Sequence, residues 1–244
     1  MNEYIEKWLR IYFKCFINAV LYYRNVYPRE SFDWTSYQAF NLPRHIPINR
    51  HPSLQEYIET LIVDVLGKLS NTKSFNLRIV TEEDAICIEK YTLDFSEFRH
   101  EDPQNMTETA VFDDLRSSLN DLLAKLQKLP AIKPGSVTFE VVIDTLGLSL
   151  GHNMNRPKNA SEKVEQEQDV NWVKCLPFGF DPTQYPTDEA MTTMPRIKMT
   201  SLVGCDVGPM VVHQFMERLI FPPRQIPIDV YETQSTVEYE SSLP

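Results

Sequence analysis

The residues that could carry covalent or metal chemistry are few and scattered in this chain of 244 residues. Its histidines are never spaced as ligand pairs, and its cysteines form neither a CxxC pair nor a dense cluster. One combination stays open, because Cys15, His51 and an acidic residue could form a nucleophile with its base. Nothing in the spacing brings these residues together. We therefore expect no metal and no cofactor, and we keep an enzyme with an unrecognised site as an alternative.

The glycine patterns that bind phosphates or present a catalytic serine are also missing. The chain has only seven glycines, and they form no GxGxxG, no GxxxxGK and no GxSxG. Nucleotide hydrolysis and serine catalysis therefore lack their usual motifs. A non-catalytic protein is the favoured interpretation.

The net charge and the spacing of the cysteines indicate which partners and which cellular compartment to expect. The formal charge is -10, and no basic cluster is visible that could neutralise a run of phosphates. We therefore do not expect direct nucleic-acid binding. Widely spaced cysteines favour reduced thiols, and hence the cytosol or the nucleus. The apolar run from Ile11 to Tyr23 is interrupted by Lys14 and Asn18 and is too short to span a bilayer, so no membrane partner is expected.

Three stretches have the apolar periodicity of helices. The first begins near Ile5 and is expected to end near Tyr27, because proline disfavours the helical conformation in the residue before it. The second begins at Pro52, which suits a first helical turn. The third carries apolar residues from Val111 to Leu129. These helices must bury their apolar faces against a sheet.

Alternating apolar residues predict strands at 74–80, 86–95 and 137–143. The first two are joined by a short acidic turn and form a hairpin. The order of helices and strands is not a βαβ series. It predicts an α+β fold, with helices layered on one side of an antiparallel sheet.

The late third of the chain is organised differently. Residues 151–169 are polar and without periodicity, so we expect a mobile loop. Trp172 then precedes about twenty proline-punctuated residues, followed by strand-like runs from Pro195 and Pro209. Irregular stretches of this length inside a domain are commonly functional or disordered, so this one could wrap around a partner. Residues 221–244 form a tail that we expect to be partly disordered.

A set of motifs, in order along the chain, resembles the HORMA-domain family. They are LYYRNVYP at 21–28, NLP at 41–43, HPSLQEYI at 51–58, NWVK at 171–174, and KMTSLVG with VVHQFMERL between 198 and 219. The resemblance covers most of the chain. It implies a single HORMA domain over residues 1–220, with three helices on an antiparallel sheet. It also implies a C-terminal safety belt, at 170–219, that closes over a partner peptide.

The motifs are most similar to the fungal branch that serves translesion DNA polymerase zeta as an accessory subunit. This resemblance implies a non-catalytic adaptor in the nucleus that supports DNA damage tolerance and mutagenic bypass. Its belt would capture a proline-containing peptide of the polymerase's catalytic subunit. The positions that match the family's groove are Tyr57 and Trp172. The alternative within the family is an adaptor of the spindle checkpoint or of the meiotic chromosome axis.

The resemblance also implies a second partner surface, which docks the scaffolding deoxycytidyl transferase of translesion synthesis. The matching positions are Thr193, His213 and Phe215, where the animal proteins carry different side chains. The arginine that animal relatives use for self-association is replaced near Leu123 by an apolar residue. A dimer through that helix therefore does not carry over, while a second copy of the chain in the assembly stays open.

Overall fold

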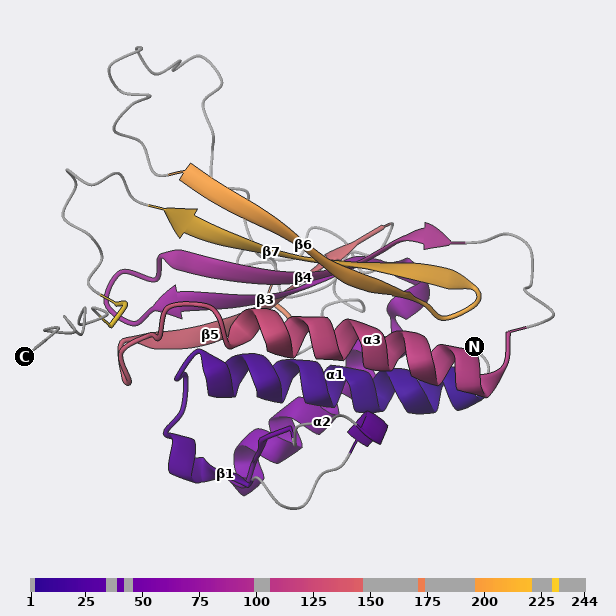
Figure 1. The fold of residues 1–244 in the computed structure, drawn as a ribbon, viewed down its shortest axis with the longest axis horizontal. Coiled ribbons are helices and arrows are strands. Elements are labelled where there is room, and N and C mark those ends of the chain that lie inside the picture. Colours follow the sequence, from indigo (N-terminus) through magenta and orange to yellow (C-terminus); the bar gives the residue numbers. More distant parts are fainter. Residues whose placement is uncertain are drawn as a thin grey trace, which may run out of the picture.

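A five-stranded antiparallel sheet forms the centre of the fold and takes its strands from both halves of the chain (Figure 1). The computed structural model describes residues 3–33, 39–41, 46–98, 106–146, 171–173, 196–220 and 230–232. The strand order is β5-β3-β4-β7-β6. The strands are β3 (Thr72–Thr81), β4 (Cys87–Phe98), β5 (Val137–Thr145), β6 (Arg196–Asp206) and β7 (Met210–Ile220).

Three helices lie on one face of this sheet, which confirms the predicted α+β class (Figure 1). They are α1 (Glu3–Tyr23), α2 (Pro52–Gly67) and α3 (Glu108–Leu126). Helix α1 contacts both α2 and α3 and lies between them. Its central position explains why apolar residues occur on nearly every side of it. Two-residue strands β1 (Phe32–Asp33) and β2 (Ile48–Asn49) pair in the predicted loop between α1 and α2.

The alternation along the strands sets which face meets the helices. In β3, Phe75, Leu77 and Ile79 are fully buried on the helix side. Phe13 of α1 packs edge-on against Phe75, with ring centroids 5.1 Å apart. Aromatic pairs in this geometry add about 0.5–1.5 kcal/mol to the burial of their area. The hydrophobic core therefore lies between α1 and the centre of the sheet.

Helix α1 ends earlier than its sequence predicts. The expected end was near Tyr27, whereas the helix stops at Tyr23. The cause is Asn25, whose φ of 51° is left-handed and cannot continue a right-handed helix. The Asn25 side chain also donates to the backbone oxygen of Ile132 at 2.6 Å. The left-handed turn at Asn25, closed by backbone hydrogen bonds from Asn25 to Tyr22 and from Val26 to Leu21, ends this helix before the proline is reached.

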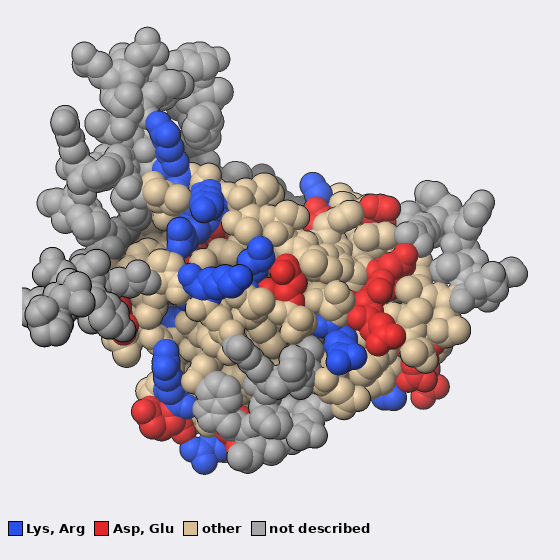
Figure 2. Space-filling view, in the orientation of Figure 1, with Lys and Arg blue, Asp and Glu red and all other residues tan. Residues whose placement is uncertain are grey.

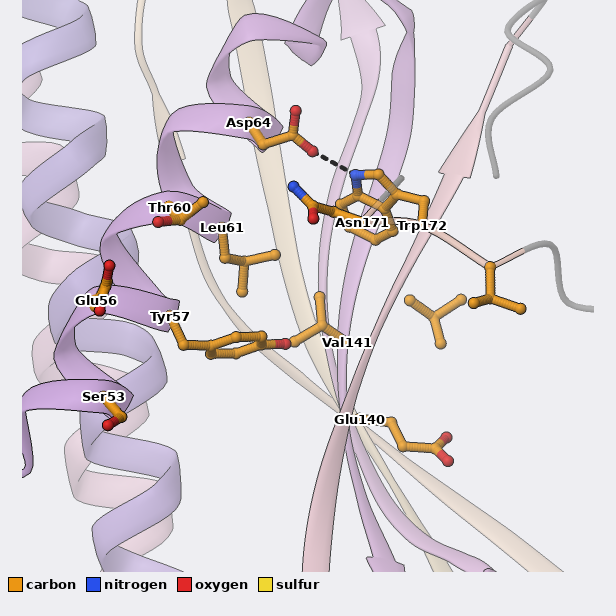
Figure 3. Close-up of a pocket in the computed structure, with 12 residues that line it drawn as sticks. Ser53, Glu56, Tyr57, Thr60, Leu61, Asp64, Glu140, Val141, Asn171 and Trp172 are labelled. Atoms are coloured by element: carbon orange, nitrogen blue, oxygen red, sulfur yellow. Dashed lines mark hydrogen bonds between the residues drawn. The ribbon is translucent and has the colours of Figure 1, made fainter. Parts of the chain in front are cut away.

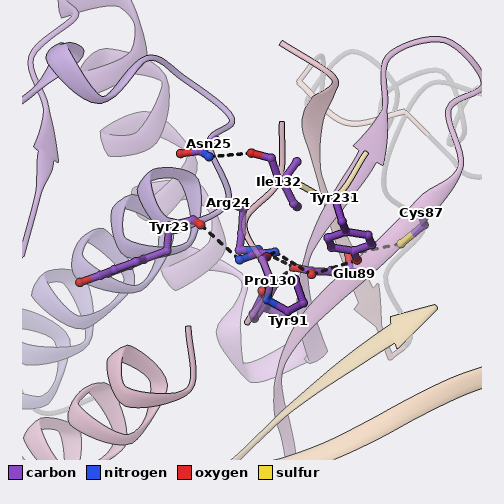
Figure 4. Close-up of polar contacts among 9 residues, drawn as sticks. All are labelled: Tyr23, Arg24, Asn25, Cys87, Glu89, Tyr91, Pro130, Ile132 and Tyr231. Carbon is purple, nitrogen blue, oxygen red and sulfur yellow. Dashed lines mark hydrogen bonds and ion pairs between the residues drawn. The ribbon is translucent and has the colours of Figure 1, made fainter. Parts of the chain in front are cut away.

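A buried ionic cluster lies just past this helix end (Figure 4). Arg24 and Glu89 are both about 1% exposed, and the guanidinium donates to the carboxylate at 2.8 and 3.0 Å. Arg24 also donates to the backbone oxygen of Pro130, and the Tyr91 hydroxyl donates to Glu89 at 2.7 Å. Burial, and then the charge of Glu89, raises the pKa of Tyr91. Each charge in this cluster is thus balanced and hydrogen-bonded within the chain.

Residues 230–232, in the predicted tail, close one side of that cluster. The Tyr231 hydroxyl donates to Glu89 at 3.2 Å, and Val230 is 5% exposed. Tyr231 forms an antiparallel bridge with Ile132, and the backbone hydrogen bonds that flank it are 2.7 and 2.9 Å long. This part of the tail is therefore built into the fold, next to the turn that precedes β5.

Basic side chains gather on the part of the surface where β6 begins, although the rest of this face carries both signs of charge (Figure 2). The register places Lys198 of β6 directly opposite Arg218 of β7. These residues are distant in the sequence, so a linear search for basic clusters does not find them.

None of the helices in the described residues combines the length and the hydrophobicity that a membrane span requires. Within the same residues, no three histidine, cysteine or acidic side chains are grouped as metal ligands.

Candidate functional site

A groove of about 670 Å³ separates α2 from the edge of the sheet (Figure 3). Helix α2 forms one wall, β5 forms the other, and residues 171–173 lie across one end. The lining residues are Ser53, Glu56, Tyr57, Thr60, Leu61, Asp64, Glu140, Val141, Val142, Asn171, Trp172 and Val173. The structure thus brings Tyr57 and Trp172 to the same groove from positions more than a hundred residues apart in the sequence.

A chain of amide contacts fixes the start of α2. Asn18 of α1 accepts a hydrogen bond from the backbone of Asn49 at 2.9 Å. The Asn49 side chain in turn accepts from the backbone of His51 at 2.8 Å. His51 caps the start of the helix directly before Pro52, and its backbone oxygen accepts from the backbone of Gln55. The wall that carries Tyr57 is therefore attached to the central helix.

Tyr57 presents an aromatic surface into the groove. It is 46% exposed, which is unusual for a large side chain on a helix with an otherwise buried apolar face. Its ring lies edge-on to Phe139 of β5, with centroids 6.0 Å apart. Partial burial, with a smaller effect of Tyr27, raises the pKa of Tyr57. At neutral pH its hydroxyl is therefore protonated and can donate a hydrogen bond.

Trp172 is attached to α2 through its indole nitrogen. Its Nε1 donates to a carboxylate oxygen of Asp64, and Lys68 forms an ion pair with the same carboxylate one helical turn later (Figure 3). The indole is half-buried and packs against the edge of the core. This contact fixes the start of the predicted belt against the groove wall.

The other wall is a sheet edge. Among the named strands of the described residues, β5 pairs only with β3. Its second edge faces the groove near Glu140, Val141 and Val142. An edge strand presents a row of backbone donors and acceptors that an extended peptide can pair with. An edge strand with aromatic side chains beside it therefore offers a peptide backbone hydrogen bonds from the strand and apolar contact from the side chains.

Carboxylates give this groove a negative character. Glu56 of α2 and Glu140 of β5 are both exposed at its lining. Asp64 is different, because Lys68 and Trp172 occupy its oxygens. The groove therefore favours a ligand that is neutral or positively charged where it passes these two glutamates.

The second predicted surface is only partly described. Thr193 lies outside the described residues, together with the rest of 174–195 and the predicted loop at 151–169. His213 and Phe215 lie two residues apart on β7, on the sheet face opposite the helices. The exposed His213 ring contacts Glu97 of β4 at 2.7 Å. This pair is separate from the groove, because β3 and β4 lie between β7 and β5.

The residues of the enzymatic alternative do not form a reactive site. Cys15 is fully buried in α1, and burial raises the pKa of its thiol. A buried protonated thiol is a poor nucleophile. His51 is exposed at the start of α2. Leu123, near which the resemblance places the animal self-association residue, is 4% exposed and packs in the core.

Two residues beside the groove were not predicted from the sequence. Asp64 and Phe139 line this region but belong to no motif that we used. A signal was available for Phe139, because it is an aromatic residue within the alternating pattern at 137–143. No sequence signal marked Asp64 as a groove residue, since an acidic side chain on an amphipathic helix ordinarily faces the solvent.

The comparison with known families matches the HORMA domain over residues 6–141. This match covers more than half of the chain, and the chain belongs to the HORMA-domain family. The family resemblance inferred from the sequence motifs is thereby confirmed.

Among curated proteins, the chain is similar to the DNA polymerase zeta processivity subunit of Saccharomyces cerevisiae (strain ATCC 204508 / S288c). The two are 50% identical over 236 residues, which cover 95% of this chain and 94% of the yeast protein.

Solved structures share the fold at much lower identity. A chain of the mitotic checkpoint complex is 14% identical, with a TM-score of 0.59, and the match covers 87% of this chain and 97% of that one. C. elegans HTP-1 bound to HTP-3 motif-1 is 12% identical, with a TM-score of 0.56, over 88% of this chain and 90% of that one. At these identities the likeness establishes the HORMA fold alone.

Proposed function

We propose that this protein is a non-catalytic accessory subunit of DNA polymerase zeta. In this proposal it captures a proline-containing peptide of the catalytic subunit in the groove between α2 and β5. The relationship to the yeast processivity subunit supports the assignment to the polymerase. The observation that carries peptide capture is the groove itself, where the exposed Tyr57 ring faces an edge of β5 that pairs with no other strand among the described residues.

The physical role of each wall follows from its chemistry. The edge of β5 supplies backbone hydrogen bonds, which hold an extended peptide irrespective of its sequence. Tyr57 and Trp172 supply aromatic faces, which suit the flat apolar ring of a proline. Proline also costs little entropy to order, because its φ is already fixed. An extended proline-containing peptide therefore matches both walls.

The proposal includes a second partner. His213 and Phe215, with Thr193, would dock the scaffolding deoxycytidyl transferase on the face of the sheet away from the helices. Phe215 is half-buried there between Thr92 and Ser201, and His213 is exposed beside it. The protein would thus join the polymerase to its scaffold in the nucleus and support mutagenic bypass of damaged DNA.

A peptide array tests the capture. Overlapping fragments of the polymerase zeta catalytic subunit are screened against the full-length protein, and the tightest fragment is measured by fluorescence anisotropy. Replacing Tyr57 and Trp172 together with alanine is expected to weaken binding by at least about thirtyfold, since truncating even one hot-spot aromatic costs about 2 kcal/mol or more. Val63→Ala is the matched control, because Val63 is an exposed apolar residue of α2 outside the groove.

Undiminished binding by the double variant would mean that the groove is not the capture site. Fragments of spindle-checkpoint or meiotic-axis proteins belong in the same array. If those bind and no polymerase fragment does, the protein is an adaptor of another HORMA pathway.

A further inference from the structure

Basic side chains lie together at the open end of the β6–β7 hairpin, on the helix side of the sheet. Lys198 of β6 is directly opposite Arg218 of β7, which is itself opposite Glu89 of β4. Residues opposite each other in an antiparallel sheet point to the same face, and Glu89 is buried beneath the helices. Arg196 points the same way, because it lies two residues before Lys198.

Helix α3 brings two lysines to the same place. Asp114 accepts a hydrogen bond from the backbone of Asp206 at 3.1 Å. Asp121, two turns later, accepts from the backbone of Val203 at 3.0 Å. Because the helix advances while the strand goes back, α3 ends beside the earlier part of β6. One lysine lies in its last turn and a second just after it. They complete a basic patch, whose residues are Lys125, Lys128, Arg196, Lys198 and Arg218 (Figure 2).

The fold does not account for this basic patch. Within the described residues, no carboxylate forms an ion pair with any of its side chains. Lys90 of β4 is built differently, because it forms an ion pair with Glu217 directly opposite it. Lys198 and Arg218 are like charges in that same relation, which destabilises a pair of strands. Cations gathered at such a cost in a chain of formal charge -10 point to an anionic partner.

The basic patch fits a phosphate backbone better than an acidic protein. Arg196 and Lys198 are about 7 Å apart along β6, which equals two steps of about 3.4 Å between the phosphates of one DNA strand. A protein interface also needs a buried apolar or aromatic anchor. The exposed Ile197 and Met199 alternate with the basic residues and therefore point to the opposite face. The patch thus offers charge without an anchor, as contacts to a nucleic-acid backbone do.

We propose that the basic patch binds the sugar-phosphate backbone of duplex DNA without reading its sequence. This site goes beyond the proposed peptide capture, because β6 lies at the edge of the sheet away from β5 and the groove. The expectation of no direct nucleic-acid binding rested on a linear search. Such a search does not find a patch whose residues come from three separate elements.

Fluorescence anisotropy with a short labelled duplex tests the proposal. The full-length protein is titrated into duplexes of two unrelated sequences, at salt concentrations from about 50 to 200 mM. The patch variant is Lys128→Gln, Lys198→Gln, which removes two exposed cations. The control, Lys7→Gln, Arg10→Gln, has the same net charge but removes two cations that are ion-paired on α1. Replacing Lys128 and Lys198 with arginine keeps both charges of the patch.

The expected result is weak binding that depends on salt and not on sequence. The unmodified protein should bind both duplexes equally, with a dissociation constant of about 0.1 mM or less at about 50 mM salt. The patch variant should lower the slope of log K against log salt by about two, and weaken binding at about 50 mM salt by about tenfold or more. The control and the arginine variant should behave like the unmodified protein.

Equal salt slopes in the patch variant and the control would overturn the proposal, as would no duplex binding by the unmodified protein at about 50 mM salt. A glutamate peptide with as many charges as the duplex is measured beside it. If that peptide binds through the patch and the duplex does not bind, the partner is an acidic protein and the proposal is wrong. The Tyr57→Ala, Trp172→Ala protein should bind the duplex normally, so failure of peptide capture and failure of DNA binding are separate results.

Discussion

The Arg24–Glu89 cluster and the Tyr57–Trp172 groove both combine aromatic and charged residues, yet they are built in opposite ways. In the cluster, the two charges are buried, and tyrosine hydroxyls and a backbone oxygen complete their hydrogen bonds. In the groove, Tyr57 is 46% exposed and Glu56 and Glu140 face open space. Polar groups satisfied inside the chain serve the fold. Aromatic and backbone groups left uncovered beside one another are available to a partner.

Breaking the buried ion pair should give the largest effect. Arg24→Met leaves Glu89 as an uncompensated buried charge, so we expect a loss of about 3–5 kcal/mol in the free energy of unfolding. Urea denaturation measures it. The double variant Arg24→Met, Glu89→Met is expected to recover much of that loss, because it removes both charges. A loss below about 1 kcal/mol in the single variant would mean that water reaches the cluster.

Shortening the tail tests whether residues 230–232 belong to the cluster. A chain ending after Asp229 loses buried Val230, the Tyr231 hydroxyl and two backbone hydrogen bonds. We expect it to be less stable by about 2–3 kcal/mol. A chain ending after Glu232 is the matched control and should unfold like the complete protein. Equal stability of the two truncated chains would show that the bridge to Ile132 contributes nothing.

Alkaline pH should weaken the cluster. Burial first, and then the charge of Glu89, raises the pKa of Tyr231, while in the unfolded chain its phenol titrates near 10. Above about pH 10 the unfolded chain loses a proton that the folded chain keeps, so stability falls as pH rises. Tyr231→Phe removes that proton, and its stability should fall less steeply, by up to about 1.4 kcal/mol per pH unit. Denaturation midpoints between pH 9 and 11 give the slopes, and identical slopes would contradict this assignment.

Replacing Tyr57 of the groove with alanine should have the smallest effect on the free energy of unfolding. Tyr57→Ala removes a side chain that is nearly half exposed and has an edge contact with Phe139, so we expect a loss of about 1 kcal/mol or less. Urea denaturation of the free protein measures it beside Arg24→Met. A loss as large as that of the ion-pair variant would make Tyr57 a structural residue and would remove the contrast between the two regions.

The elements of the groove were largely predictable, whereas the arrangement of the cluster was not. Pro52 and the apolar face of α2 predicted one wall, and the alternation at 137–143 predicted the other. Which strand would remain at the sheet edge depends on β7 pairing with β4 across more than a hundred residues. Local periodicity contains no information about such pairing. The groove was therefore predicted only through the family resemblance.

One half of the Arg24–Glu89 ion pair could have been predicted from the alternation of apolar residues along β4. Tyr91, Leu93 and Phe95 point toward the core, and the period of two places Glu89 on the same side. An acidic residue at an inward position demands a partner, but its sequence neighbours do not supply one. Arg24 meets it only because α1 ends at Tyr23 and the next turn changes direction at Asn25. The left-handed backbone at Asn25 is the feature that the prediction of the helix end from Pro28 did not include.

The strand order sets the distance between the two proposed partner surfaces. The groove borders β5, and His213 and Phe215 lie on β7, three strand spacings away, or about 14 Å across the sheet. Two partners bound at these places would be tethered to one rigid platform at nanometre separation. Their effective concentration toward each other would then be about millimolar, far above that of the same two partners diffusing freely in dilute solution. Such a platform could speed an exchange between its two partners without doing any chemistry itself.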